Sequence, residues 1–296
     1  MNKKIVKLNG GLGNQMFQYA FALALAEKFN VEVVFDFSYF EEVKTCNKVA
    51  SRVYELGVFN IECKEATKQD LSKIKRPDFE SKFKNKLAKI FPKRFGINYV
   101  REKNNYAFDK KIFKNPDYLF YEGYFQNEKY FKHLRAALLK SFSLKAPLDA
   151  NNQDILEKIK NTNSVSIHVR RGDYVSLDYV KKIHGVCSLD YYKKAIEYIS
   201  KNVENPYFFL FSDDIEWVIE NLNIEYPYTV VDFNQGKGWL DMELMKNCKH
   251  NITANSSFSW WGGWLNENKN KIVITPKNWT AKKQKCDIIP KEWIKL

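Results

Sequence analysis

The sequence predicts an α/β protein with parallel sheets, and two observations carry this prediction. Residues 4–37 read as a strand, a glycine loop, a helix and a second strand, which together make one β-α-β unit. From residue 165 onward, strands and helices alternate strictly, and such alternation predicts a parallel sheet that helices cover on both faces. Ligands of parallel sheets bind at the carboxyl ends of the strands, so the residues that follow each strand are the first candidates for a site.

In the first half of the chain, apolar spacing sets the limits of each expected element. Residues 4–8 and 31–37 are apolar runs and are predicted strands, whereas residues 14–29 carry apolar side chains at helical spacing. A further helix is expected at residues 128–141. Residues 79–95 combine an apolar helical stripe with lysines on the other faces. This pattern is typical of either a basic helix on an anionic membrane surface or an ordinary surface helix.

The second half supplies the longer run of alternating elements. Its strands are predicted at residues 165–169, 207–211, 228–232, 251–254 and 272–275. The helices between them are predicted at residues 188–200, 215–222, 240–248 and 257–265. The proline-containing segment 146–149 indicates a boundary, so we expect one domain over residues 1–150 and a second over residues 151–296.

Composition narrows the classes of partner without choosing among them. The 296 residues carry a net charge of +13, which suits nucleic acid, an anionic membrane surface or a phosphorylated small molecule. No apolar stretch approaches the roughly 18 residues that a membrane span needs, and no signal-peptide core is present. We therefore expect a cytoplasmic protein, either free or peripheral on the cytosolic face of the inner membrane.

The first motif is the glycine loop of residues 10–15 (GGLGNQ), which joins a strand to a helix. Such a loop lets the backbone approach a ligand closely and offers a helix N-terminus to an anion. A dinucleotide-binding loop, with Asp36 as the ribose acid, is the obvious rival. Its third glycine would have to stand where this chain has Gln15 or Met16. A turn with only a structural role is the other alternative.

The second motif is an arginine pair directly after a strand, in residues 168–174 (HVRRGDY). Guanidinium groups bind phosphate oxygens in a bidentate manner, so Arg170 and Arg171 are candidates for holding a phosphorylated ligand. Asp173 could orient one of them. A surface cluster of ion pairs is the alternative interpretation.

The third motif is an aspartate pair at the next strand end, Asp213 and Asp214. Paired carboxylates bind a metal, read a guanine edge, or cap the following helix. No two aspartates in the chain are separated by a single residue, so the D-x-D pattern that holds a divalent ion is absent. This absence favours chemistry without a metal.

The fourth motif, residues 255–265 (NSSFSWWGGWL), places small polar residues where a strand ends and a helix begins. Backbone donors and serine hydroxyls make this an anion site. The tryptophans either stack on a sugar or pack the helix against the sheet.

Together these four stretches resemble the α-1,2-fucosyltransferases of glycosyltransferase family 11, as found in bacteria. HVRRGDY, FSDD and NSSFSWWGGWL match in that order, and residues 122–126 (EGYFQ), 184–188 (HGVCS) and 241–245 (DMELM) also look like family sequence. The resemblance implies a GT-B type fold, with two Rossmann-like domains whose parallel sheets face each other across a cleft. The first domain would bind mainly the acceptor, and the second would bind GDP-fucose.

The resemblance also implies an inverting transfer of L-fucose from GDP-β-L-fucose to the 2-hydroxyl of a terminal galactose, in a surface polysaccharide such as an O-antigen or in an oligosaccharide. No cofactor and no metal would be required. The partners would be GDP-fucose and a galactose-terminated glycan, with peripheral contact to an anionic membrane surface and no nucleic acid.

Roles at individual positions follow from the same resemblance. Arg171 would stabilise the leaving group, and Asn14 would lie near the reacting carbon. The implied donor-binding residues are Gly11, Gly13, His168, Arg170, Arg171, Asp213, Asp214, Asn255, Ser256, Ser257 and Phe258. The implied acceptor-binding residues are Glu122, Tyr124, Gln126 and His184. The candidates for a general base are Asp173, Asp178, His184 and Glu122, and a mechanism without a dedicated base is also open.

Three alternatives remain at this point. The chain could use another GDP-sugar, acceptor or linkage, or it could resemble the protein O-fucosyltransferases in its activity. A basic RNA-binding module is the distant alternative, although no RRM, KH or helix-turn-helix pattern is present. An NAD-dependent dehydrogenase is disfavoured by the missing third glycine.

Overall fold

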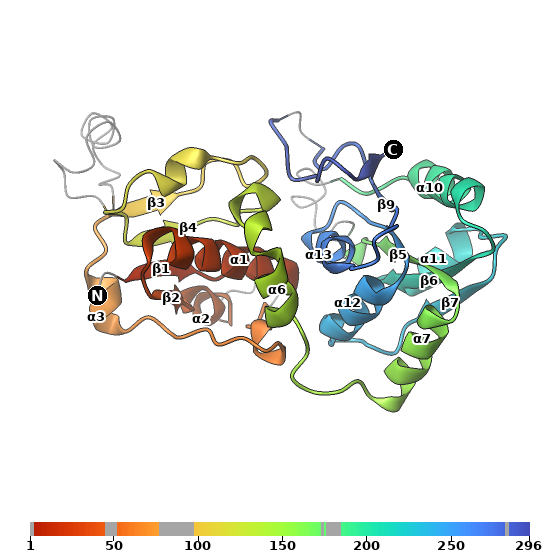
Figure 1. Cartoon of the computed structure of the whole chain (residues 1–296), viewed down its shortest axis with the longest axis horizontal. Helices are drawn as coiled ribbons and strands as arrows, with labels where there is room; N and C mark the ends of the chain where they lie inside the picture. Colours follow the sequence, from red (N-terminus) through yellow and green to blue (C-terminus); the bar gives the residue numbers. More distant parts are fainter. Residues whose placement is uncertain (1–2, 45–51, 77–97, 173–174, 176–184, 282–283) are drawn as a thin grey trace. The chain divides into compact units, whose positions relative to one another are not determined.

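The chain folds into two compact units, which Figure 1 shows in a computed structural model. The structure describes residues 3–44, 52–76, 98–172, 175, 185–281 and 284–296. The units are Met1–Ser143 and Leu144–Leu296. The division comes after Ser143, upstream of the boundary expected at residue 150.

The first unit is built on a four-stranded sheet with the order β2-β1-β4-β3. β1 (Lys4–Lys7) pairs in parallel with β2 (Val33–Asp36) and with β4 (Phe120–Glu122), and β4 pairs in parallel with β3 (Tyr99–Arg101). The strands predicted at residues 4–8 and 31–37 are therefore confirmed. β3 and β4 have three residues each, which is too short for a periodic signal in the sequence.

The long helix α1 (Leu12–Phe29) follows β1, as predicted. The helix expected at residues 128–141 is instead interrupted. It consists of the 3₁₀ turns η3 (Glu128–Tyr130) and η4 (Lys132–Leu134), followed by α6 (Arg135–Ser141). Between the two turns the backbone of Phe131 leaves the helical region, with φ −140° and ψ 3°, and its fully buried ring lies 5.9 Å from that of Phe17. The helix is therefore interrupted at Phe131, where the side chain becomes buried in the core.

Shorter elements complete the first unit. They are α2 (Ser38–Lys44), η1 (Leu56–Val58), α3 (Lys68–Ser72) and η2 (Lys110–Phe113). On one face of the sheet, Ile5, Val34 and Phe120 form a buried cluster. The expected basic helix of residues 79–95 lies outside the described residues.

The second unit contains a six-stranded parallel sheet with the order β10-β9-β8-β5-β6-β7. Its strands are β5 (Asn163–Val169), β6 (Pro206–Ser212), β7 (Tyr228–Val231), β8 (His250–Ile252), β9 (Val273–Thr275) and β10 (Ile294–Lys295). The five predicted strands are present, and only the two-residue β10 was not predicted. The α/β class with parallel sheets is confirmed.

Helices cover both faces of this sheet. They are α7 (Ala150–Lys160), α10 (Leu189–Asn202), α11 (Ile215–Asn221), α12 (Gly238–Asn247) and α13 (Ser257–Leu265). Alternate residues of β5, among them Val165 and Ile167, pack with α10 and α11 in the main apolar core. The intervening residues face the other way, since Ser166 accepts a hydrogen bond from Asn251 and His168 contacts Phe258 of α13. No described helix is both long enough and apolar enough to cross a bilayer.

Candidate functional site

The arginine pair and the aspartate pair lie side by side at the carboxyl edge of the second sheet. β5 and β6 are neighbouring parallel strands, in which His168 pairs with Phe211 and Val169 with Ser212. Arg170 and Arg171 follow β5, and Asp213 and Asp214 follow β6. Two motifs more than 40 residues apart are therefore joined by strand register, as the sheet rule predicts.

Each aspartate holds one arginine. Arg170 Nη1 lies 2.7 Å from Asp213 Oδ2, and Arg171 Nε donates to Asp214 Oδ2 at 2.9 Å. The backbone N–H of Arg171 also donates to Asp213 Oδ1, at 2.8 Å. The guanidinium carbon of Arg171 lies 3.6 Å from the centre of the Trp217 ring, a close cation–π contact. The Arg171 side chain, which is 16% exposed, is thus fixed in orientation before any ligand arrives.

Asp214 binds Arg171 through the Nε of its guanidinium. Within the described part of the chain, its two Nη groups have no hydrogen-bond partner, because the Nε takes the Asp214 carboxylate. A guanidinium held through one edge presents its remaining donors as a preoriented site for an anion. The alternative that Asp214 caps α11 is wrong, because its side chain makes no capping hydrogen bond there.

His168 is buried beside the arginine pair. Only 5% of the residue is exposed, and its ring lies 5.3 Å from that of Phe258. Burial lowers the pKa of His168 to about 4, with the charge of Arg170 also lowering it and that of Asp213 opposing the shift. The imidazole is therefore neutral at pH 7. Its buried Nδ1 finds no hydrogen-bond partner among the described residues, so this atom has an unused hydrogen-bonding capacity.

The start of α13 closes this edge of the sheet. Ser256 is the N-cap, and its hydroxyl accepts the backbone N–H of Phe258 at 3.3 Å. Asn255 is buried, and its side-chain amide donates to the backbone oxygens of Gly185 and Trp279. A pocket of about 270 Å³ adjoins Asn255 and is lined in part by residues 185–188.

The tryptophans of this motif belong to the core. Trp260 and Trp261 are fully buried, and Trp264 is 3% exposed. The indole N–H of Trp260 donates to the backbone oxygen of Ile288 at 3.0 Å. The packing alternative is therefore confirmed, because in this structure these rings are enclosed in the core and are not exposed to a sugar.

A second group of predicted residues meets at the carboxyl edge of the first sheet. Gly11 is the N-cap of α1, and Gly10 has φ 75°, a conformation that favours glycine. A Cβ on Gly10 would lie 2.5 Å from Nδ2 of Asn14, so the Asn14 side chain folds back over this loop. Its Oδ1 accepts a hydrogen bond of 2.6 Å from Nε2 of Gln126.

Glu122 and Tyr124 lie at the same edge, because β4 neighbours β1. The Tyr99 hydroxyl donates a short hydrogen bond to Glu122 Oε2, and Arg101 Nε lies 4.0 Å from Glu122 Oε1. Four predicted residues, Asn14, Glu122, Tyr124 and Gln126, are thus brought together by adjacent strands.

Sequence reasoning missed two glutamines that hold this edge. Gln15 donates to the oxygens of Gly10 and Val53, and Gln18 donates to those of Asn9 and Gly123. Both are fully buried on α1. The sequence signal that could have found them is a pair of amide side chains within a mostly apolar helix. A polar side chain that becomes buried there needs hydrogen-bond partners.

Some expectations lie beyond what the structure describes. Asp173, Asp178 and His184, three of the four general-base candidates, fall outside the described residues. Within the described ranges, no group of three His, Cys, Asp or Glu side chains is placed to hold a metal ion.

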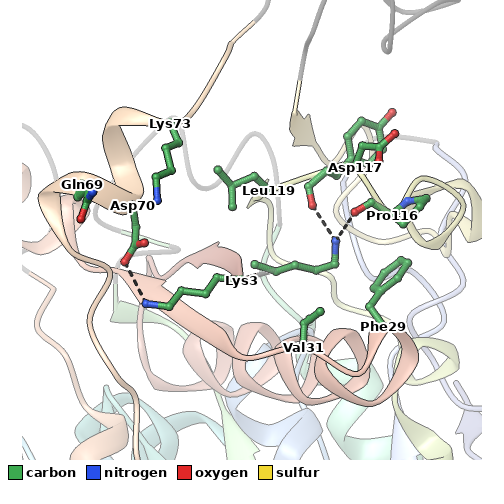
Figure 2. Close-up of a pocket in the computed structure, with 11 residues that line it drawn as sticks. Lys3, Phe29, Val31, Gln69, Asp70, Lys73, Pro116, Asp117 and Leu119 are labelled. Atoms are coloured by element: carbon green, nitrogen blue, oxygen red, sulfur yellow. Dashed lines mark hydrogen bonds and ion pairs between the residues drawn. The ribbon is translucent and has the colours of Figure 1, made fainter. Parts of the chain in front are cut away.

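A pocket of the first unit lies at the opposite edge of its sheet, where β1 begins (Figure 2). It measures about 600 Å³. Lys4 Nζ donates to the oxygens of Pro116 and Tyr118, and Lys3 pairs with Asp70 at 3.5 Å. None of the predicted site residues lines this pocket.

The sequence comparisons with known proteins agree on a family of glycosyltransferases. The sequence model described as "Glycosyl transferase family 11" matches residues 2–296. The chain is 36% identical to the O-antigen biosynthesis glycosyltransferase WbnK of Escherichia coli, covering 98% of this chain and 99% of that protein. It is 34% identical to an alpha-1,2-colitosyltransferase of Escherichia coli, covering 100% and 99%.

Among solved structures, an Arabidopsis thaliana FUT1 mutant in complex with GDP superposes with a TM-score of 0.52 at 11% identity. The match covers 95% of this chain and 72% of that one. At this identity the likeness concerns the fold, and it supports the GT-B type that the family resemblance implied.

Proposed function

This chain belongs to glycosyltransferase family 11, and from that premise we propose that it transfers L-fucose from GDP-β-L-fucose to the 2-hydroxyl of a terminal galactose. One observation carries the proposal furthest. Two arginines, each held by its own aspartate, stand at the carboxyl edge of the second sheet beside a helix N-terminus. That arrangement suits a diphosphate leaving group.

The physical argument concerns the charge of the departing GDP. As the glycosidic bond breaks, negative charge develops on the β-phosphate oxygen, and a mechanism without a metal must meet this charge with fixed donors. Arg171 supplies guanidinium N–H groups, and Ser256 and Ser257 supply hydroxyls at the start of α13. Because Asp214 and Trp217 already orient Arg171, little reorganisation is needed when the charge appears.

The other donor contacts follow from the same edge. His168 is one of the implied donor-binding residues, and a neutral imidazole whose Nδ1 has no partner among the described residues suits a hydrogen bond to the guanine base. Asp213 and Asp214 act on the donor by holding the arginines. We assign the acceptor to the first unit, and we propose that Asn14, whose Oδ1 accepts a hydrogen bond from Gln126, lies near the reacting carbon.

A second donor is favoured by one specific observation. The identity of 34% to an alpha-1,2-colitosyltransferase spans the whole chain, so colitose is the rival of fucose as the transferred sugar. Colitose lacks the 3-hydroxyl of fucose, and a site that hydrogen-bonds this hydroxyl would discriminate strongly between the two. The relative named for O-antigen biosynthesis suggests a galactose within such a polysaccharide as the acceptor, reached at the cytosolic face of the membrane.

The proposal is tested by incubating the protein with GDP-fucose and lactose in the presence of EDTA. The expected product is heavier than lactose by one deoxyhexose and carries an α-1,2 linkage to galactose by NMR. A parallel reaction with GDP-colitose ranks the two donors by kcat/KM. Binding of GDP-fucose without any product would put the acceptor in doubt, and a folded protein that binds neither donor would overturn the proposal.

Replacement of Gly172 by alanine tests the aspartate support of the arginines. A Cβ at this position would lie 2.4 Å from Asp213 Oδ2 and 3.0 Å from its Cγ. Asp213 cannot retreat without lengthening its bonds to Arg170 and to the Arg171 backbone. Loss of one charge-assisted bond costs roughly 1.5–3 kcal/mol, so we expect GDP-fucose to bind about tenfold or more weakly, by calorimetry.

The matched control is Gly57→Ala in the first unit. There the nearest atom to a built Cβ is Tyr54 Cε1 at 3.4 Å, an ordinary contact. Its dissociation constant for GDP-fucose should equal that of the wild type. Equal binding by Gly172→Ala as well would mean that Asp213 does not support the donor site.

A further inference from the structure

Glu102 is a buried carboxyl group that neither the family resemblance nor the sequence motifs single out. It follows β3, and only 8% of the residue is exposed. Its Oε2 accepts two backbone N–H groups, from Tyr124 at 2.9 Å and from Phe125 at 2.8 Å. Its own backbone N–H donates to the oxygen of Glu122. One side chain thus organises the turn that carries the expected acceptor-binding residues.

The turn needs this support because its backbone is strained. Phe125 has φ 54°, a left-handed conformation that a bulky residue rarely adopts. Its ring is fully buried and stacks on Phe21 at 3.7 Å between centroids. At Gly123, a Cβ would lie 2.5 Å from Cβ of Glu102, so only glycine lets the two segments approach this closely.

The turn ends at a residue of the candidate site. Gln126 is 5% exposed, and its Nε2 donates to Asn14 Oδ1 at 2.6 Å. The path from Glu102 to Asn14 therefore runs through two backbone hydrogen bonds, a short turn and one side-chain hydrogen bond. A displacement of the turn would move Gln126 and release the Asn14 side chain.

We propose that Glu102 is a positioning residue of the acceptor side, which holds the turn of residues 123–126 and thereby fixes Gln126 against Asn14. The inference rests on the proposed function, since it assigns Asn14 to the reacting carbon. Glu102 acts through the turn and not on the substrate. A glutamine at this position keeps a carbonyl oxygen for both N–H groups, whereas an alanine removes the acceptor altogether.

Hydrogen exchange tests the structural step without any substrate. In the wild type, the amides of Tyr124 and Phe125 should be protected within a peptide that spans residues 122–127. Glu102→Ala should abolish this protection, and Glu102→Gln should retain it. The control is Asp70→Ala, because Asp70 is also buried and accepts a backbone N–H, from Thr67, but lies at the opposite edge of the sheet. Unchanged protection in Glu102→Ala would overturn the proposal.

Kinetics test the step from the turn to catalysis. Misplacement of a reacting group by about 1 Å can cost on the order of 10²-fold, so Glu102→Ala should lose about this factor in kcat/KM for the acceptor. The KM for GDP-fucose should change less than that for the acceptor, because the arginine pair and the start of α13, which are proposed to hold the diphosphate, lie in the second unit. Glu102→Gln should restore most of the rate, and Asp70→Ala should keep it. Transfer at the wild-type rate by a Glu102→Ala protein with an exposed turn would overturn the positioning role.

These experiments distinguish a failure of the proposed function from a failure of the role assigned to Glu102. If the wild type transfers no sugar, the proposed function fails, while the exchange experiment still reports whether Glu102 holds the turn. If the wild type is active and only the exchange result is negative, the function stands and the role of Glu102 falls.

The pH dependence gives an independent readout. Burial raises the pKa of Glu102 to about 7, against the lowering effect of the N–H groups of Phe125 and Tyr124, and the charge of Asp109 raises it further. A carboxyl group with a raised folded-state pKa stabilises the fold at low pH, and this contribution is lost as the pH rises through 7. The Tm of the wild type should therefore fall relative to that of Glu102→Gln between pH 5 and pH 8.5. If the difference in Tm between the wild type and Glu102→Gln stayed constant over this pH range, Glu102 would not titrate with a raised pKa.

Discussion

Replacing Arg171 by alanine is expected to lower kcat/KM for sugar transfer by on the order of 10²–10³, the loss that follows removal of one donor from an oxyanion-type site. The orientation of Arg171 is fixed by Asp214 at 2.9 Å and by the face of Trp217 at 3.6 Å. Its Nη groups have no hydrogen-bond partner among the described residues, and Arg171 follows β5 at the edge of the sheet where the diphosphate is proposed to bind. The rate should fall more than the affinity for GDP-fucose, because the charge grows in the transition state.

Arg171→Lys separates charge from geometry. The ammonium keeps the positive charge but cannot take Asp214 and an anion at once through a planar fork. We expect it to recover only part of the lost rate. Arg135→Ala, which removes an arginine of α6 in the first unit, is the control and should leave the rate unchanged. If Arg171→Ala transferred sugar as fast as the control, the leaving group would have to be stabilised elsewhere.

The stability of Arg171→Ala should differ little from that of the wild type. Asp214 would lose its ion-pair partner, but its side chain is 36% exposed and water can solvate the carboxylate. A thermal unfolding measurement checks this expectation. An unchanged Tm would mean that a low rate comes from the missing guanidinium and not from unfolding of the protein.

The strands of the second unit could be predicted from the sequence because each one is marked by a pattern of neighbouring residues. Each strand is an apolar run between turn residues, and the polar motifs follow directly at the strand ends. Strand register then brings Arg171 and Asp214 together without any further assumption. The strand β10 was not predicted, because two residues are too few to show a periodic pattern.

The first unit was harder to predict because its organisation depends on contacts between distant residues. Glu102 supports residues 124 and 125, which lie more than 20 positions away. Phe131 breaks a helix that its neighbours would otherwise continue, because its ring enters the core against Phe17. Neither effect leaves a local pattern, since both are decided by which side chains become buried.

The tryptophans of α13 show how packing decides between two meanings of one motif. An aromatic run at the start of a helix beside a proposed sugar site suits either stacking on the ligand or a role in the core. Trp260 has no exposed surface, and its indole N–H is already taken by Ile288. The rings of Trp261, Trp264 and Trp293 surround it, at 5.0, 5.9 and 5.7 Å between centroids.

Trp260→Ala should therefore destabilise the second unit by about 3–5 kcal/mol, the usual cost of removing a buried aromatic side chain. The lost hydrogen bond to the Ile288 oxygen adds to the cavity. The Tm of this unit should fall on the order of 10 °C in a calorimetric scan. Trp260→Phe should fall less, because it keeps an apolar ring and loses mainly the N–H donor.

The same variants decide whether the ring has any part in sugar recognition. If Trp260 acts only through packing, Trp260→Phe assayed well below its Tm should bind acceptor and GDP-fucose with wild-type constants. A raised KM for the acceptor in a fully folded Trp260→Phe protein would contradict a purely structural role. It would require the start of α13 to open during catalysis, because an enclosed ring cannot reach a sugar. A normal KM with a lowered Tm would instead mean that Trp260 acts through packing, which positions the N-terminus of α13, where Ser256 and Ser257 are proposed to bind the donor.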